Sequence, residues 1–120
     1  MNAQAVSAAS GSANVDAIFR ALADPTRRNV VERLSQKPAS ASDLAAPYRM
    51  ALLSFVEHMK VLEGCGLVRS RKQGRVRTYE LSVNRLKLAE DWLSRQRRFW
   101  EKRLDQLDEY LLKMKKGEEK

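Results

Sequence analysis

A long apolar stripe near the end of the sequence constrains the fold more than any other feature. Its members recur at steps of three, four or seven residues, as Leu86, Ala89, Leu93, Trp100, Leu104, Leu107, Leu111 and Met114. This spacing places them on one face of a helix, which Ser82 or Asn84 can cap and which we expect to reach about Lys115. Such a helix measures roughly 45 Å, which is too long for a small core to cover. We therefore expect part of the stripe to pack against a second copy of the chain, the alternative being a helix folded back over its own domain.

Composition narrows the class of protein. At 120 residues and 43% hydrophobic content, the chain supports one small domain with a modest core. The sequence shows neither a signal peptide nor an apolar run of about 20 residues, so we expect a cytoplasmic protein with no membrane partner. Cys65 is the only cysteine and His58 the only histidine, which disfavours a metal site. No nucleophile with a base and an orienting group is readable, so we expect neither an enzyme nor a cofactor.

Positive charge is concentrated in one short segment. The net charge of the chain is +8. Residues 64–84 carry one anion against five cations, which are Arg69, Arg71, Lys72, Arg75 and Arg77. Residues 67–72 and 75–81 are rich in Val, Arg, Thr and Tyr, and Gln73-Gly74 between them suits a hairpin turn. The cations then crowd a protruding hairpin whose positive potential suits phosphate, although a solubilising surface is the alternative.

Two helices are expected at the start of the folded region. The first begins near Val15, where Asn14 can cap it, and it must end at Asp24 because the residue before a proline is pushed out of the helical region. Its apolar face consists of Val15, Ile18, Phe19 and Leu22. Asp24 can also cap a second helix, which Pro25 can open at its first position. At the start of that helix Arg27 and Arg28 oppose the helix dipole, so a phosphate or an acidic partner is plausible there.

Two more helices precede the basic hairpin. Ser40 or Ser42 can cap a short third helix, and Pro47 prevents a long continuation. A fourth spans about residues 51–63, with Leu52, Phe55, Met59 and Leu62 on one face. A glycine follows it as the end signal. Two short helices around a turn with a proline are typical of a helix-turn-helix.

Several motifs in this order resemble one known family. They are Leu22-Ala23-Asp24-Pro25-Thr26-Arg27-Arg28, His58 followed by Lys60-Val61-Leu62, Gly66-Leu67-Val68, and Gly74-Arg75 with Tyr79 and Leu81. Together they resemble the winged helix-turn-helix of the ArsR family of bacterial transcription regulators, over about residues 15–83. The resemblance implies a homodimeric repressor that binds double-stranded DNA. In it the first and last helices form the dimer interface, the fourth helix enters the major groove, and the hairpin, or wing, grips the backbone or the minor groove.

The expected fold class is mainly α with a small β-hairpin wing, a winged helix-turn-helix with a long C-terminal dimerisation helix. We expect a disordered tail over residues 1–14, the DNA-binding domain over 15–83, the dimerisation helix over 84–116 and a polar tail over 117–120. Where many relatives carry a metal-binding Cys-x-Cys, residues 42–45 are Ser-Asp-Leu-Ala. Metal sensing is therefore not expected, and no effector is predicted.

Two sets of site residues follow from the helical and strand patterns and from the resemblance. The predicted DNA contacts are Ser54, Glu57, His58, Lys60, Arg71, Lys72, Arg75 and Arg77. The predicted dimer interface comprises Val15, Ile18, Phe19, Trp92, Trp100, Leu104, Leu107 and Leu111. No catalytic or metal-binding residue is predicted.

Some of these residues have a second interpretation. His58 suits a core histidine as well as a phosphate contact, and Cys65 is more typical of a small packed residue than of a redox sensor. Glu57 either repels the phosphates or accepts a hydrogen bond from cytosine. With Leu53 and Val56 on the outward face of the same helix, the main alternative function is a winged-helix protein-interaction module that no longer reads DNA. A non-specific RNA binder is the third hypothesis.

Overall fold

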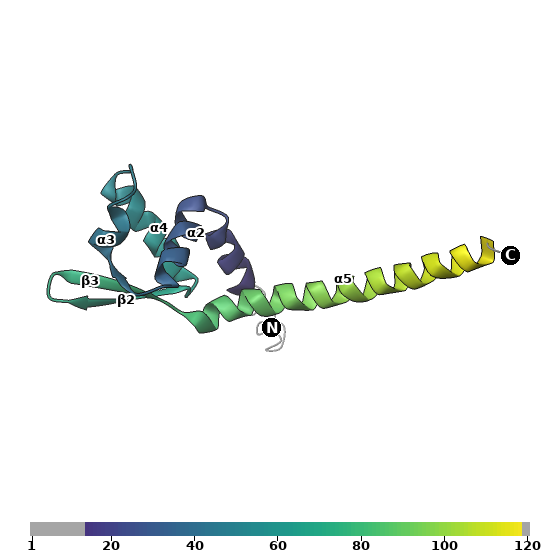
Figure 1. The fold of residues 1–120 in the computed structure, drawn as a ribbon. Coiled ribbons are helices and arrows are strands. Elements are labelled where there is room, and N and C mark those ends of the chain that lie inside the picture. The colour runs from purple at the N-terminus through teal and green to yellow at the C-terminus, as the bar shows by residue number, and fades with distance from the viewer. Residues whose placement is uncertain (1–13, 119–120) are drawn as a thin grey trace, which may run out of the picture. The chain divides into compact units, whose positions relative to one another are not determined.

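The computed structural model describes residues 14–118. The first element among the described residues is a helix over residues 14–22. The elements that follow are α2 (Pro25–Leu34), β1 (Ala39–Ser40), α3 (Ala41–Ala45), α4 (Leu52–Gly64), β2 (Val68–Gln73), β3 (Val76–Leu81) and α5 (Val83–Glu118), as Figure 1 shows. The chain divides into two compact units, the first ending at Ala89 and the second beginning at Glu90. Residues 1–13 of the tail predicted to be disordered lie outside the described residues.

The junction between the first two helices forms as the sequence predicts. The carboxylate of Asp24 accepts a hydrogen bond from the backbone N–H of Arg27 at 3.0 Å, and Pro25 occupies the first helical position of α2. Asp24 itself has an extended backbone, as N-cap residues do. The bond from Arg27, together with the nearby charges of His58 and Arg27, lowers the pKa of Asp24 in spite of partial desolvation. The carboxylate thus stabilises the start of α2 in its ionised form.

The predicted hairpin is part of a three-stranded antiparallel sheet in the order β1-β3-β2. β2 pairs with β3 from Val68 opposite Leu81 to Gln73 opposite Val76, so Gly74 and Arg75 form the turn. Gly74 has a φ of +62°, which a residue without a side chain adopts at no steric cost. The turn lies one residue later than predicted. β1 was not predicted, because two residues are too short for a strand pattern to show.

One hydrophobic core lies within the first unit. It draws on every helix of that unit and on the hairpin, through Ile18, Ala21, Val30, Val31, Leu34, Leu44, Phe55, Met59, Leu62, Leu67, Val68, Tyr79 and Ala89. The predicted inward face of the second helix is confirmed, and that of the fourth helix is confirmed for Phe55, Met59 and Leu62. The placement of Leu52 on the same face is wrong, because this residue lies in the first turn of α4 with 70% of its surface exposed. Ala89 shows that the first turns of α5 also belong to this core, so the first unit extends beyond the boundary expected at residues 83 and 84.

The second unit, from Glu90 onward, is the remainder of α5. The helix continues to Glu118, a little further than predicted. Every apolar member of the stripe in this unit is exposed, from Leu93 to Met114. No helix within residues 14–118 is both long and apolar enough to cross a membrane.

Asp24→Ala should destabilise the fold by about 1 kcal/mol, because an N–H at the start of α2 loses its acceptor. Asp24→Asn is the matched control, since asparagine caps about as well but carries no charge. The pKa of Asp24 is lower in the folded state, so its charge contributes stability above the unfolded pKa of about 3.9, and this contribution is lost as pH falls through the folded value. Urea unfolding at pH 7 and pH 3 measures both effects. An Asp24→Ala variant as stable as wild type at pH 7 would contradict the capping role.

Candidate nucleic-acid interface

Helix α4 presents a mixed surface on its solvent side. Phe55, Met59 and Leu62 anchor the helix in the core. The predicted contacts Ser54, Glu57 and Lys60 are all exposed. Leu52, Leu53, Val56 and Val61 are exposed too. The solvent side of α4 therefore combines a few polar groups with four exposed aliphatic side chains.

His58 lies on the flank of α4 and faces a neighbouring helix junction. Its Nδ1 lies 3.1 Å from a guanidinium nitrogen of Arg27 and 3.6 Å from a carboxylate oxygen of Asp24. A neutral imidazole accepts from Arg27 at Nδ1, because guanidinium only donates, whereas a protonated imidazole pairs with the carboxylate of Asp24 instead. The side chain is 23% exposed. The structure thus ties His58 to α2, in agreement with the interpretation of a structural histidine, and leaves only part of its ring open to solvent.

The two arginines at the start of α2 bind carbonyl groups at the end of the preceding helix. Arg27 donates from Nε to the carbonyl of Ala21 at 2.7 Å and from a terminal nitrogen to the carbonyl of Arg20 at 3.2 Å. Arg28 donates to the carbonyl of Leu22 at 2.9 Å. Carbonyls at the end of a helix lack partners within it and carry a partial negative charge. These bonds to carbonyl groups account for the two arginines at the start of α2. The phosphate or acidic partner that the sequence suggested is not needed there.

Arg33 likewise binds carbonyl groups at the end of α3. It donates to the carbonyls of Asp43 and Leu44, both at 2.9 Å, and its guanidinium lies over the ring of Tyr48. The ring of Tyr48 in turn stacks on Phe55 of α4, with the two centroids 5.8 Å apart. These contacts connect α2, α3 and α4. No local pattern predicts them, because each arginine reaches an element 6 to 11 residues away.

The wing cations divide into two kinds. Arg69 forms an ion pair with Glu80 at 3.2 Å, and Arg77 donates to the hydroxyl of Ser70 at 2.8 Å. Within residues 14–118, Arg71, Lys72 and Arg75 have neither an ion pair nor a hydrogen bond from their side chains. All of these cations are exposed. The hairpin therefore carries charge that its own fold does not neutralise.

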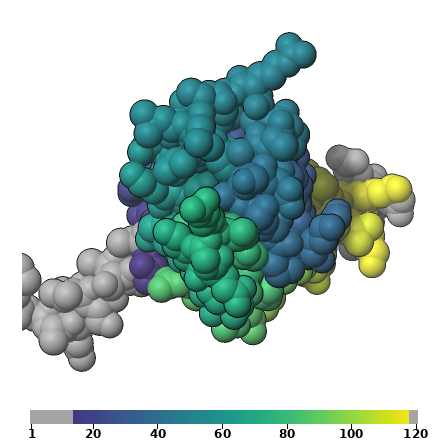
Figure 2. All heavy atoms as spheres, turned by 90° about the vertical axis from the view of Figure 1, so that its left-hand side faces the viewer, coloured from purple at the N-terminus to yellow at the C-terminus, as the bar shows by residue number. Residues whose placement is uncertain are grey.

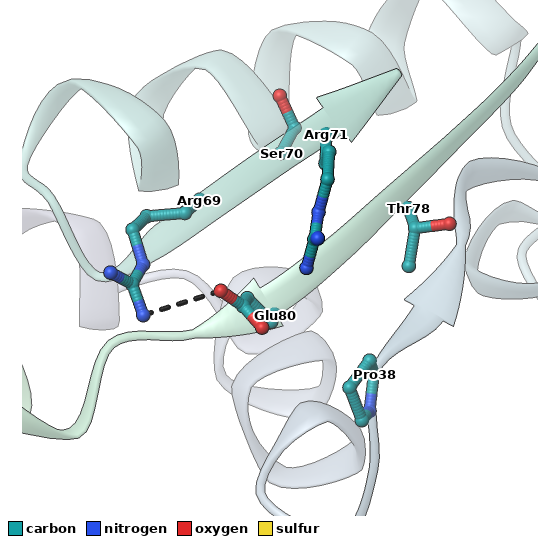
Figure 3. A pocket seen from close by; sticks show the side chains of 6 residues that line it. All are labelled: Pro38, Arg69, Ser70, Arg71, Thr78 and Glu80. Atoms are coloured by element: carbon teal, nitrogen blue, oxygen red, sulfur yellow. Dashed lines mark ion pairs between the residues drawn. The ribbon is translucent and has the colours of Figure 1, made fainter. Parts of the chain in front are cut away.

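Strand register distributes this charge over both faces of the hairpin. Val68 and Tyr79 are buried on one face, so Lys72 and Arg77 share the side that leads to α4. Arg69 and Arg71 lie on the opposite face. There they border a hollow of about 260 Å³ together with Pro38, Ser70, Thr78 and Glu80. Figure 3 shows Arg71 extending across the hairpin toward β3, and Arg69 beside Glu80.

A groove of about 290 Å³ lies between α4 and the wing. It is lined by Val56, Met59, Lys60, Glu63, Arg77 and Tyr79. Burial raises the pKa of Tyr79, and the nearby negative charge of Glu63 acts in the same direction. In Figure 2 the hairpin, in green, and the teal segment that includes α4 are exposed together on one face of the first unit. Glu63 and Tyr79 were not predicted as part of this surface, because Glu63 lies at the end of α4 and only the fold brings Tyr79 of β3 beside that helix.

Glu57 has a nearby cation on its own helix. Its carboxylate lies 3.4 Å from the ammonium of Lys60, and both side chains are about two-thirds exposed. A surface pair of this kind contributes little stability, but it reduces the negative charge that Glu57 presents outward. Glu57 and Lys60, both predicted DNA contacts, are therefore paired with each other.

The predicted dimer residues fall into three groups. Ile18 has an exposed fraction of 0% within a single chain, so it has no surface left for a partner, and its assignment to the interface is wrong. Its neighbours Val15 and Phe19 are half-buried. The exposed members of the set lie on α5 and are Trp92, Trp100, Leu104, Leu107 and Leu111.

Among the described residues, no group of three or more His, Cys, Asp or Glu side chains is placed to hold a metal ion.

Comparison with known proteins identifies the family. Residues 22–71 match the model of a helix-turn-helix domain. An HTH-type transcriptional regulator of Mycobacterium tuberculosis, Rv2034, is 36% identical over 74% of this chain and 80% of its own length. The crystal structure of an ArsR family transcriptional regulator, RHA00566, is 48% identical over 75% of this chain and 93% of that chain, with a TM-score of 0.72. The chain belongs to the ArsR family of transcriptional regulators.

A further relative of this ArsR-family regulator is the transcriptional repressor SdpR of Bacillus subtilis. It is 25% identical over 63% of this chain and 84% of its own length. The predicted family and the predicted fold class, a mainly helical winged helix-turn-helix with a long final helix, are thus confirmed.

Arg27→Lys should destabilise the first unit by about 1–3 kcal/mol, because an ammonium group cannot replace a guanidinium that reaches two carbonyls and His58 together. Arg28→Lys is the matched control, since that guanidinium makes one such bond. Urea unfolding followed by circular dichroism measures both variants. Equal stability of the two would show that the Arg27 contacts do not hold the helices together.

Proposed function

We propose that this ArsR-family regulator is a homodimeric repressor that binds specific DNA sequences through its first unit. In this proposal α4 enters the major groove, and the wing contacts the phosphate backbone or the minor groove. The observation that carries the proposal is the cluster of exposed cations on a hairpin that borders the exposed face of α4. Such a repressor acts on the chromosome by binding and without catalysis, and we expect it in the cytoplasm.

Electrostatics supports this role for the wing. Arg71, Lys72 and Arg75 lie at or near the hairpin tip without a neutralising partner among the described residues. Arg77 is held by Ser70 on the side that leads to α4. Phosphate contacts of this kind supply affinity and fix the orientation of the protein, whereas base contacts supply specificity. The wing and α4 would thus contribute different parts of the binding energy.

The similarity to SdpR supports repression as the outcome of binding. Steric exclusion of the transcription machinery from an occupied site needs no further activity of the bound protein. The alternative, a protein-interaction module with a winged fold, rests on the aliphatic residues Leu53 and Val56. Titrating the protein with a selected duplex and a scrambled duplex over a range of salt separates the two. The proposed regulator shows a specificity ratio, whereas an interaction module shows neither specificity nor a salt slope.

Charge removal from the wing should weaken binding to every duplex alike. Arg71→Ala combined with Arg75→Ala removes two proposed phosphate contacts, so the plot of log K against log salt should flatten by about 0.9 per contact. Lys113→Ala combined with Lys115→Ala is the matched control, because it removes the same net charge from α5. Fluorescence anisotropy at several salt concentrations measures the slopes. An unchanged slope in the wing variant would exclude these two contacts.

The second unit supports dimer formation. Leu93, Trp100, Leu104, Leu107, Leu111 and Met114 follow one another at steps of seven, four, three, four and three residues, which is the spacing of a coiled-coil seam. All of them are exposed in the single chain. A contiguous apolar stripe of this length is unusual on the surface of a monomer. We propose a second copy of the chain as the partner that covers it, with Val15 and Phe19 of the first helix contributing.

Leu104→Glu should convert the dimer to a monomer, because a carboxylate in an apolar seam costs several kcal/mol. Leu112→Glu is the matched control: Leu112 is 59% exposed and Leu104 56%, but Leu112 lies off the stripe. Sedimentation velocity at micromolar concentration measures the oligomeric state. A monomeric wild type, or a Leu104→Glu variant that remains dimeric, would contradict the proposed seam.

A further inference from the structure

The exposed side chains of α4 lack most of the groups that read bases by hydrogen bonds. The sequence of the helix, LLSFVEHMKVLEG, contains no Arg, Asn or Gln. Guanine is commonly read by Arg or Lys, and adenine by Asn or Gln. Lys60 is the one remaining candidate of this kind on α4, and its ammonium lies 3.4 Å from Glu57. Hydrogen bonding from α4 therefore offers little discrimination between base pairs.

The first two turns of α4 are instead aliphatic on their exposed side. Leu52 is 70% exposed, Leu53 73% and Val56 36%. Leu53 shares the outermost row of the helix with Glu57, four residues later, and Val56 lies toward the wing, where it lines the groove beside Arg77. The beginning of a recognition helix is the part that contacts base edges in helix-turn-helix proteins. The aliphatic residues occupy that part.

The charges around this surface indicate a nucleic acid as its occupant. Arg77, Lys60 and Glu63 line the groove next to Val56, and Arg49 is exposed shortly before the helix, so three cations face two carboxylates when Glu57 is included. An apolar patch bordered by cations complements the major groove, whose rims are phosphates. The C5-methyl group of thymine is the apolar group that base edges present in this groove.

We infer that Leu53 and Val56 recognise thymine methyl groups, so that each half-site carries thymines beneath the first two turns of α4. This inference rests on the proposed function, because it names the chemistry by which that site selects DNA. It also gives the aliphatic surface of Leu53 and Val56 a role in DNA recognition. The same surface otherwise favours a protein-interaction module. Glu57 then needs no base partner of its own, since Lys60 lies beside it.

Replacement of thymine by uracil in a selected duplex tests the inference. The full-length protein first selects binding sequences from random duplexes, and each thymine of the consensus is then replaced by uracil, which removes the methyl group and leaves the pairing edge unchanged. At one or two positions per half-site we expect affinity to fall about fourfold, the equivalent of about 0.8 kcal/mol for one buried carbon group. Fluorescence anisotropy at one fixed salt concentration measures the affinities.

Alanine variants assign the effect to individual side chains. Leu53→Ala and Val56→Ala should each abolish the uracil effect at one position and leave the other positions as they are. Val83→Ala is the matched control, because Val83 is 69% exposed and belongs to the same unit. It should retain the whole uracil effect. Loss of the effect in the α4 variants alone supports the inference.

The possible failures are distinguishable. If the protein selects no sequence, the proposed function fails and the inference fails with it. If it selects a sequence but tolerates uracil at every position, the proposed function stands and methyl recognition is overturned. If the uracil effect persists in both α4 variants, a different group contacts the methyl and the assignment to Leu53 and Val56 is overturned.

Discussion

The contacts of one guanidinium hold the helices of the first unit together. Arg27 lies in the first turn of α2, whose N-terminus Asp24 caps, and its side chain closes the last turn of the preceding helix by binding the carbonyls of Arg20 and Ala21. The same group reaches His58 on α4. At Arg27, therefore, the proposed recognition helix meets two helix ends that carry opposite partial charges. The orientation of α4, and with it the exposed face that the proposed function uses, depends on this junction.

Arginine serves two purposes in this small unit, and only the fold distinguishes them. Arg27, Arg28 and Arg33 bind carbonyl groups within the chain, so their positive charge compensates helix ends. Arg71 and Arg75 have no such acceptor among the described residues. A net charge of +8 alone does not say which cations are available to a partner. Of these five arginines, only the two on the hairpin keep their charge available to a partner.

Much of the fold was predictable from the sequence, because prolines, glycines and helical periods act over a few residues. The cap at Asp24, the apolar face of α4 and the long final helix all follow from such local patterns. Long-range features were less accessible. The turn at Gly74 and Arg75 lies one residue later than expected, which moves each cross-strand partner by two positions and brings Arg69 opposite Glu80. The burial of Ile18 and the contacts of Arg27 depend on elements that only the folded chain brings together.

The composition of α4 and that of the wing imply a separation of affinity from specificity. Contacts between cations and phosphates release counterions, so their contribution falls steeply as salt rises. Contacts between aliphatic side chains and methyl groups carry no charge and change little with salt. If Arg71 and Arg75 supply affinity while Leu53 and Val56 supply selection, moderate salt should weaken binding to all DNA and leave the preference for one sequence over another nearly unchanged. A recognition helix that read bases with cations would instead lose affinity and preference together.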